Sequence, residues 1–96
     1  MGVDEIFNLK RTEILRLAAR YGVKNLRVFG SVARGQAGPQ SDVDFLVDLE
    51  QGRTYLDLGA FLLDAQDLLG RRVDLVTEKA LNAVIRDRVL AEAVSL

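Results

Sequence analysis

Two aspartates separated by one residue, Asp42 and Asp44, are the side chains of this sequence best suited to chemistry. They lie at the start of an apolar run, residues 43–49, that alternates as a strand does. Side chains of a strand repeat their direction every two residues, so both carboxylates should leave one face with Cα atoms about 6.6 Å apart. Carboxylates this close repel each other unless a cation lies between them. Oxygen ligands select Mg2+ or Mn2+, and Mg2+ commonly binds one or two carboxylates together with substrate phosphates. The pair therefore indicates a metal that carries a nucleotide.

A third aspartate, Asp74, lies in a separate short apolar run, with Val73 and Leu75 on the opposite side of the expected strand. If the two strands are neighbours, their spacing of about 4.8 Å places Asp74 beside Asp42 and Asp44. Three converging acids can hold two metal ions about 3.5–4 Å apart, one on the triphosphate and one on an attacking hydroxyl. Asp74 would then be available as a general base.

A glycine and a serine, Gly30 and Ser31, follow an expected strand and precede a helical turn. Backbone N–H groups and the Ser hydroxyl can point at a phosphate in such a turn, and Gly permits its close approach. The alternative is a simple turn that ends a strand, and the Walker phosphate-loop pattern is absent. Arg34 is either a phosphate clamp or a surface residue tied to Asp42 or Ser41. Ser41 is expected to order Asp42 by hydrogen bonding rather than to react.

The aspartate pair also has an ordinary explanation. Asp42 would then be a turn or capping acid, and Asp44 would face water from an exposed strand. The turn at Gly30 and the third acid in another strand favour a site over this explanation. An EF-hand calcium loop is excluded, because Leu46 stands where an oxygen ligand is needed.

The apolar periodicity predicts the elements that position these residues. In chain order we expect a helix over Val3–Tyr21, a strand over Leu26–Phe29, a helical turn over Ser31–Gly35, a loop over Gln36–Ser41, a strand over Val43–Leu49, a turn over Glu50–Arg53, a helix over Tyr55–Leu69 ending at Gly70, a strand over Arg72–Val76, and one or two helices within Glu78–Val94. This order implies an α/β or α+β layer with helices packed on a small sheet, whose strand order is left open.

Composition restricts the function classes. The 96 residues are 49% hydrophobic, which is enough for one compact domain over residues 1–96. The chain has neither Cys nor His, so disulfides, common zinc ligands and Ser-His-Asp triads are excluded. Its 13 basic and 14 acidic residues nearly cancel, and we therefore expect no direct nucleic-acid binding. The two charges of Arg71 and Arg72 are interpreted as a solvated turn. No apolar run has the length of a membrane span, so we expect a soluble cytoplasmic protein without membrane contact.

At these residues the chain resembles the DNA polymerase beta type nucleotidyltransferase superfamily. That signature is Gly-Ser, a spacer of about ten residues, Asp-x-Asp and a later Asp in a strand. Residues 30–35, Gly-Ser-Val-Ala-Arg-Gly, and 41–47, Ser-Asp-Val-Asp-Phe-Leu-Val, resemble more narrowly the minimal nucleotidyltransferase (MNT) proteins of prokaryotes. The resemblance covers practically the whole chain, and it implies the polymerase beta type fold with helices on a small mixed β-sheet.

The resemblance also implies roles for the residues. Gly30 and Ser31 would hold the triphosphate of ATP, Asp42 and Asp44 would bind two Mg2+ ions, or Mn2+, and Asp74 would complete the metal site and activate the acceptor hydroxyl. Related MNT proteins are commonly encoded beside a HEPN-domain protein. The implied role is an antitoxin that transfers AMP to a Tyr of that HEPN toxin.

Two other functions stay open. The chain could neutralise its partner by occlusion without turnover, since it has no second domain to bind the base or the acceptor. Transfer to a small molecule such as an aminoglycoside is a third, weaker option, because such enzymes usually use additional domains. The helix Tyr55–Leu69 carries apolar residues outside its main stripe: Leu56, Phe61, Leu63 and Leu68. They either face a partner protein or are buried by the first or last helix.

Overall fold

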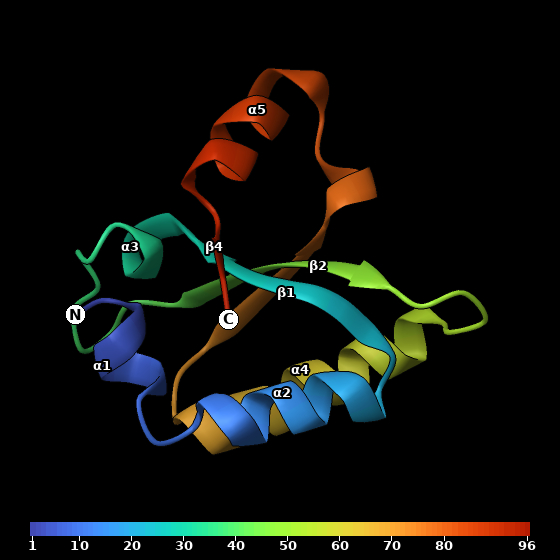
Figure 1. Ribbon diagram of the computed structural model, residues 1–96, viewed down its shortest axis with the longest axis horizontal. Coiled ribbons are helices and arrows are strands. Elements are labelled where there is room, and N and C mark those ends of the chain that lie inside the picture. The colour runs from blue at the N-terminus through green and yellow to red at the C-terminus, as the bar shows by residue number, and fades with distance from the viewer.

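The frame of the molecule is a four-stranded mixed β-sheet in the order β3-β2-β1-β4, seen in the computed structural model, which describes residues 1–96 (Figure 1). β1 runs antiparallel to both β2 and β4, whereas β2 and β3 are parallel. The elements in chain order are α1 (Val3–Phe7), α2 (Arg11–Arg20), β1 (Val23–Phe29), α3 (Gly30–Ala33), β2 (Val43–Leu49), α4 (Tyr55–Leu69), β3 (Val73–Thr77), the 3-10 turn η1 (Glu78–Ala80), α5 (Ala83–Glu92) and β4 (Val94–Ser95). The expected fold, helices on a small mixed sheet, is confirmed.

Two helices, α2 and α4, lie side by side across one face of the sheet (Figure 1). They cover the inward side chains of β2, among which Phe45 is fully buried. Its ring lies 5.9 Å from that of Phe7 on α1 and 6.1 Å from that of Phe61 on α4, measured between centroids. These three rings form the centre of the main core, because aromatic side chains bury the most apolar area. Residues that alternate with the inward set therefore project from the opposite face of the sheet.

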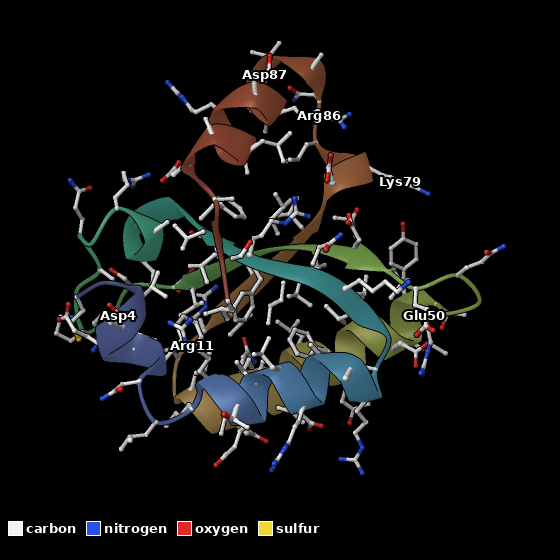
Figure 2. All side chains as sticks on the ribbon, in the orientation of Figure 1. Asp4, Arg11, Glu50, Lys79, Arg86 and Asp87 are labelled. Carbon is white, nitrogen blue, oxygen red and sulfur yellow. The ribbon has the colours of Figure 1, made fainter.

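The first helix was predicted as one element over Val3–Tyr21, and this is wrong. The chain leaves the helix at residues 8–10 and enters α2 at Arg11. Asn8 favours helix ends over helix interiors, because its side chain competes for backbone hydrogen bonds. Leu9, counted in the apolar pattern, is 88% exposed, so nothing buries it to sustain a continuous helix. Asp4 and Arg11 face each other across the break, 3.4 Å apart (Figure 2).

The N-terminus is held by the loop before β2. The amino group of Met1 donates to the carbonyl of Ala37 at 2.8 Å, and the N–H of Ala37 donates back to the Met1 carbonyl at 3.0 Å. This two-bond pairing ties the start of the chain to the loop.

The expected bounds of β2 and α4 agree with the structure. α4 begins at a capping box, in which the Thr54 hydroxyl accepts from Leu56 N–H at 3.2 Å and the Asp57 carboxylate accepts from Thr54 N–H at 3.0 Å. It ends at Gly70, whose φ of +65° is the left-handed stop that glycine favours. With 15 residues it is the longest helix, and no helix has the length and apolarity to cross a bilayer.

In the C-terminal segment, η1 to β4, the turn η1 and the helix α5 lie on the other face of the sheet from α2 and α4 (Figure 1). The segment leaves β3 at one edge and returns to pair with β1 at the far edge. Leu46 of β2 and Val89 of α5 are buried outside the main core, on this side of the molecule. The expected one or two helices within Glu78–Val94 are a 3-10 turn and one helix, and Val94 belongs to a strand instead. β1 is longer than expected and begins at Val23.

Candidate active site

Strand pairing places Asp44 beside Asp74, and these two residues together with Asp42 are called the acidic row below. Asp44 of β2 is the register partner of Asp74 on the parallel neighbour β3. On its other side, Asp44 is the partner of Phe29, the last residue of β1. The expectation that the strand of Asp74 adjoins that of Asp44 is therefore confirmed. Both carboxylates leave the sheet on the face opposite Phe45 and the main core.

Gly30 follows Phe29 directly and passes against the Asp44 side chain. A Cβ at Gly30 would collide with Oδ2 of Asp44 and would lie 3.2 Å from its Cγ. The backbone φ of Gly30 is +75°, in the left-handed region that other residues rarely adopt. Two independent requirements, a backbone angle and an empty space, thus demand glycine here. Ser31, next in the chain, is half-buried in the first turn of α3.

Burial and the neighbouring carboxyl groups make ionisation of Asp44 unfavourable. The pKa of Asp44 is raised from 3.8 to about 6, first by burial, then by the charges of Asp74 and Asp42 and by a hydrogen bond with Asp74. Arg34 acts in the other direction and lowers this pKa. Asp44 is half-buried, whereas Asp74 is exposed. The row is therefore a concentration of negative charge with one member reachable from solvent.

The donor set fits a hard divalent cation. All three acids offer oxygen ligands only. A bound cation would stabilise the ionised form of Asp44, whose pKa is raised by burial and by the neighbouring acidic charges. As the side chains stand, no three acidic residues form a group arranged to hold a metal ion. Asp42 is half-buried and is turned toward the exposed Arg72, with 3.9 Å between Oδ1 and Nε. Binding a cation would require the Asp42 carboxylate to move inward.

Arg34 is tied to neither of the partners considered for it. Its Nη1 donates to Oε1 of Glu92 on α5 at 2.5 Å, and its Nε donates to Oε1 of Gln36 at 3.1 Å. The alternative in which Arg34 pairs with Asp42 or Ser41 is therefore wrong, because the guanidinium turns toward the C-terminal segment. The other alternative, a phosphate clamp, stays a prediction. Glu92 lies 58 residues away in the sequence, and no local pattern could have indicated it.

The loop before Asp42 is held by residues that the sequence did not single out for this role. The Ser41 hydroxyl accepts from Gly38 N–H at 2.8 Å, so it orders the loop and not Asp42 directly. Nη1 of Arg71 donates to the carbonyls of Gly38 and Ser41 at 2.9 and 3.2 Å. Arg71 is half-buried, and its interpretation as part of a solvated turn is wrong. That interpretation holds for Arg72, whose side chain is 84% exposed.

Hollows of the surface lie beside the acidic row and not on it. One, with a volume of about 370 Å3, is lined by the loop and the end of α4, including Ser41, Gln66 and Arg72. Another, of about 390 Å3, lies at the far end of β2 between Glu50 and Lys79. The second is too distant along the strand to share the chemistry of Asp44. None of the hollows is lined by Asp42, Asp44 or Asp74.

The surface of α4 retains exposed apolar side chains. Leu56 is 85% exposed and Leu63 is 62% exposed, as is most of Tyr55. Phe61 is fully buried and Leu68 is half-buried. The fold therefore covers Phe61 and Leu68 and leaves Leu56 and Leu63 uncovered, and the contact of the uncovered pair with a partner protein stays a prediction.

Residues 11–96 match the family model of the nucleotidyltransferase domain. The chain belongs to this family. More narrowly, it is similar to a solved structure described as a candidate minimal nucleotidyltransferase, with 47% identity and a TM-score of 0.87 over 100% of this chain and 97% of that one. It is also 39% identical over 95 residues to the protein adenylyltransferase MntA of Thermococcus cleftensis, covering 96% of this chain and 93% of that protein. A toxin-antitoxin crystal structure with AMP-PNP shares the fold, with 19% identity and a TM-score of 0.75 over 90% of this chain and 71% of that one.

Proposed function

We propose that residues 1–96 act as a single minimal nucleotidyltransferase domain that transfers AMP from ATP to a hydroxyl, a Tyr, of a HEPN-domain toxin, and so serves as its antitoxin. The observation that carries this proposal is the register pairing of Asp44 with Asp74 beside Gly30. The similarity to a protein named protein adenylyltransferase supports AMP as the transferred group. The shared fold with a toxin-antitoxin structure that contains AMP-PNP is consistent with a toxin as the acceptor.

In this proposal the acidic row holds the metal. Asp42 and Asp44, with Asp74, would bind Mg2+, two ions or alternatively Mn2+, through carboxylate oxygens. The bound metal supplies charge neutralisation of the triphosphate and lowers the pKa of the attacking hydroxyl. Gly30 and Ser31 would bind phosphate oxygens through backbone N–H groups and the hydroxyl, and Arg34 would add a positive charge.

The reaction is an in-line substitution at the α-phosphorus. The acceptor oxygen forms a bond to phosphorus as the bond to the pyrophosphate oxygen breaks, and pyrophosphate leaves. The proton of the acceptor hydroxyl goes to Asp74. Asp74 is suited to this role because it is exposed and lies on β3, an edge strand of the sheet, where an acceptor can approach.

The test is transfer of label from α-labelled ATP to the co-purifying partner protein. Asp42→Asn and Asp44→Asn each remove a proposed metal ligand, and transfer should fall at least about 100-fold while the fold survives. Asp87→Asn, a change at an exposed position of α5, is the matched control and should transfer at the wild-type rate. Undiminished labelling by either site variant would contradict the mechanism.

Occlusion of the partner without turnover is the second candidate. The exposed Tyr55, Leu56 and Leu63 on α4 favour it, because they are a contact surface that catalysis does not need. Under occlusion, Asp42→Asn and Asp44→Asn should still protect cells that express the partner. Loss of protection together with loss of transfer would exclude it.

A further inference from the structure

The guanidinium of Arg34 is held at two of its three nitrogens. Glu92 accepts from Nη1 at 2.5 Å and Gln36 accepts from Nε at 3.1 Å, whereas Nη2 makes no hydrogen bond within the chain. The arginine side chain is half-exposed, and without these partners it would sample many rotamers. Fixing two nitrogens leaves one donor in a defined direction. The guanidinium is also close enough to the acidic row to act on the charge of Asp44.

Glu92 occupies a position that is unfavourable for an acid. It is the last residue of α5, where backbone carbonyls leave a partial negative charge that disfavours a carboxylate. Its side chain is only 19% exposed, so water does little to offset this. The ion pair with Arg34 compensates for both effects. Helix stability alone gives no reason for an acid here, whereas the orientation of Arg34 does.

The C-terminal segment gives Glu92 a fixed support. Glu78 accepts from Arg27 of β1 at 3.4 Å and from Arg86 of α5 at 2.9 Å, which ties η1 to the sheet and to the helix. At the other end β4 pairs with β1, and Val89 is buried between these two anchors. Figure 2 shows Arg86 and Asp87 on the part of α5 that lies farthest from the sheet. The segment is thus anchored at both ends, with Glu92 at the end nearer α3.

We propose that Glu92 is a positioning residue that holds Arg34 with its free Nη2 available to the triphosphate of the bound nucleotide. This inference rests on the proposed function, and it assigns to the C-terminal helix a part in nucleotide binding. Glu92 touches neither nucleotide nor acceptor. It acts through Arg34 alone.

The experiment measures the dissociation constant of ATP with Mg2+ by calorimetry, and KM and kcat for transfer, on the full chain. Glu92→Gln keeps the side-chain size but removes the charge, and it should raise both the dissociation constant and KM about tenfold, as loss of an outer-shell partner does, with little change in kcat. Arg34→Lys keeps the positive charge but cannot be held at two nitrogens, and it should show the same loss. Asp87→Asn, on the same helix, should bind as the wild type does.

A double-mutant cycle separates positioning from a purely structural role. In an Arg34→Met background, Glu92→Gln should have no further effect on nucleotide affinity, because the residue through which it acts is gone. Wild-type affinity in Glu92→Gln, or additive losses in the double variant, would overturn the inference and leave the proposed function standing. Failure of the wild-type chain to bind the nucleotide would overturn both.

Discussion

The carboxylate of Asp44 lies so close to Gly30 that there is no room for a side chain at position 30. The Asp44 carboxylate occupies the space in which any other residue at position 30 would carry its Cβ. The left-handed backbone at Gly30, with φ of +75°, brings the turn after β1 against the acidic row. The backbone conformation of Gly30 therefore places the turn that would bind phosphate next to the acid that would bind metal.

This contact predicts how Gly30→Ala differs from Gly35→Ala. Both glycines have nearly the same positive φ, +75° and +74°, but a Cβ at Gly35 would meet nothing within 4 Å. Gly35→Ala should therefore lower the free energy of unfolding by about 1 kcal/mol, the effect of backbone strain alone. Gly30→Ala should lower it further and should also abolish nucleotide binding, since Asp44 must move. Urea unfolding and calorimetry measure the two effects, and equal values for the two variants would argue against the contact.

The raised pKa of Asp44 predicts a pH dependence of stability. Its folded value of about 6 lies above the ordinary 3.8, so the folded state favours the neutral form. The contribution of Asp44 to stability is complete below pH 3.8 and is lost as the pH rises through 6. Without metal, the free energy of unfolding should fall less between pH 4 and 7 in Asp44→Asn than in the wild type. Mg2+ should stabilise the wild type more at pH 7 than at pH 5. Parallel pH profiles for the two proteins would contradict this.

The two neighbouring arginines after α4 should respond differently to substitution. Arg71 donates to two loop carbonyls, so Arg71→Met should lower the free energy of unfolding by about 1–2 kcal/mol and weaken nucleotide binding, because the loop orients Asp42. Arg72→Met removes an exposed side chain with one distant ion pair, and stability should change by less than about 0.5 kcal/mol. Thermal unfolding of both variants makes the comparison. Equal destabilisation would show that the loop contacts of Arg71 have no special weight.

Gly59, in the middle of α4, should be replaceable at a gain in stability. It is exposed, and a Cβ there would meet nothing within 4 Å. Glycine weakens a helix interior relative to alanine, so Gly59→Ala should raise the free energy of unfolding of the isolated chain by about 0.5–1 kcal/mol. If Tyr55, Leu56 and Leu63 dock the partner closely, the same change should weaken partner binding. Chemical denaturation gives the first quantity and calorimetry with the partner gives the second.

Elements with strong local signals were predictable from sequence, and those defined by distant contacts were not. The bounds of β2 follow from its alternating apolar residues, and the end of α4 follows from Gly70. Both signals lie within the element itself or directly beside it. The start of the chain before α1 pairs with Ala37, 36 residues away from Met1, and no local pattern indicates such a contact. β4 has two residues and exists only because β1 offers an edge. No periodicity extends over so short a strand.

The acidic site divides in the same way. Strand alternation and strand spacing are general, so they were enough to predict that Asp74 lies beside Asp44. The side chain of Asp42, in contrast, is turned toward Arg72. Glu92 and Arg71 were missed, since the first lies 58 residues from its partner and the second bonds to backbone carbonyls, which leave no mark in a sequence. Supporting residues of this kind become visible only when the chain is folded.

The parallel register of β2 and β3 has a consequence for how this site can be lost. It begins with the bond from Val43 N–H to the carbonyl of Arg72 at 2.9 Å, and Gln66 of α4 accepts from Val73 N–H at 3.1 Å. The contact with Gln66 of α4 thereby helps to determine which residues of β3 face the helix and which face away from it. One extra residue between Gly70 and Val73 would turn Asp74 down toward that helix and present an apolar neighbour in its stead. Such an insertion would remove Asp74 from the proposed metal site and so abolish transfer, although every acid of the motif would remain in the sequence.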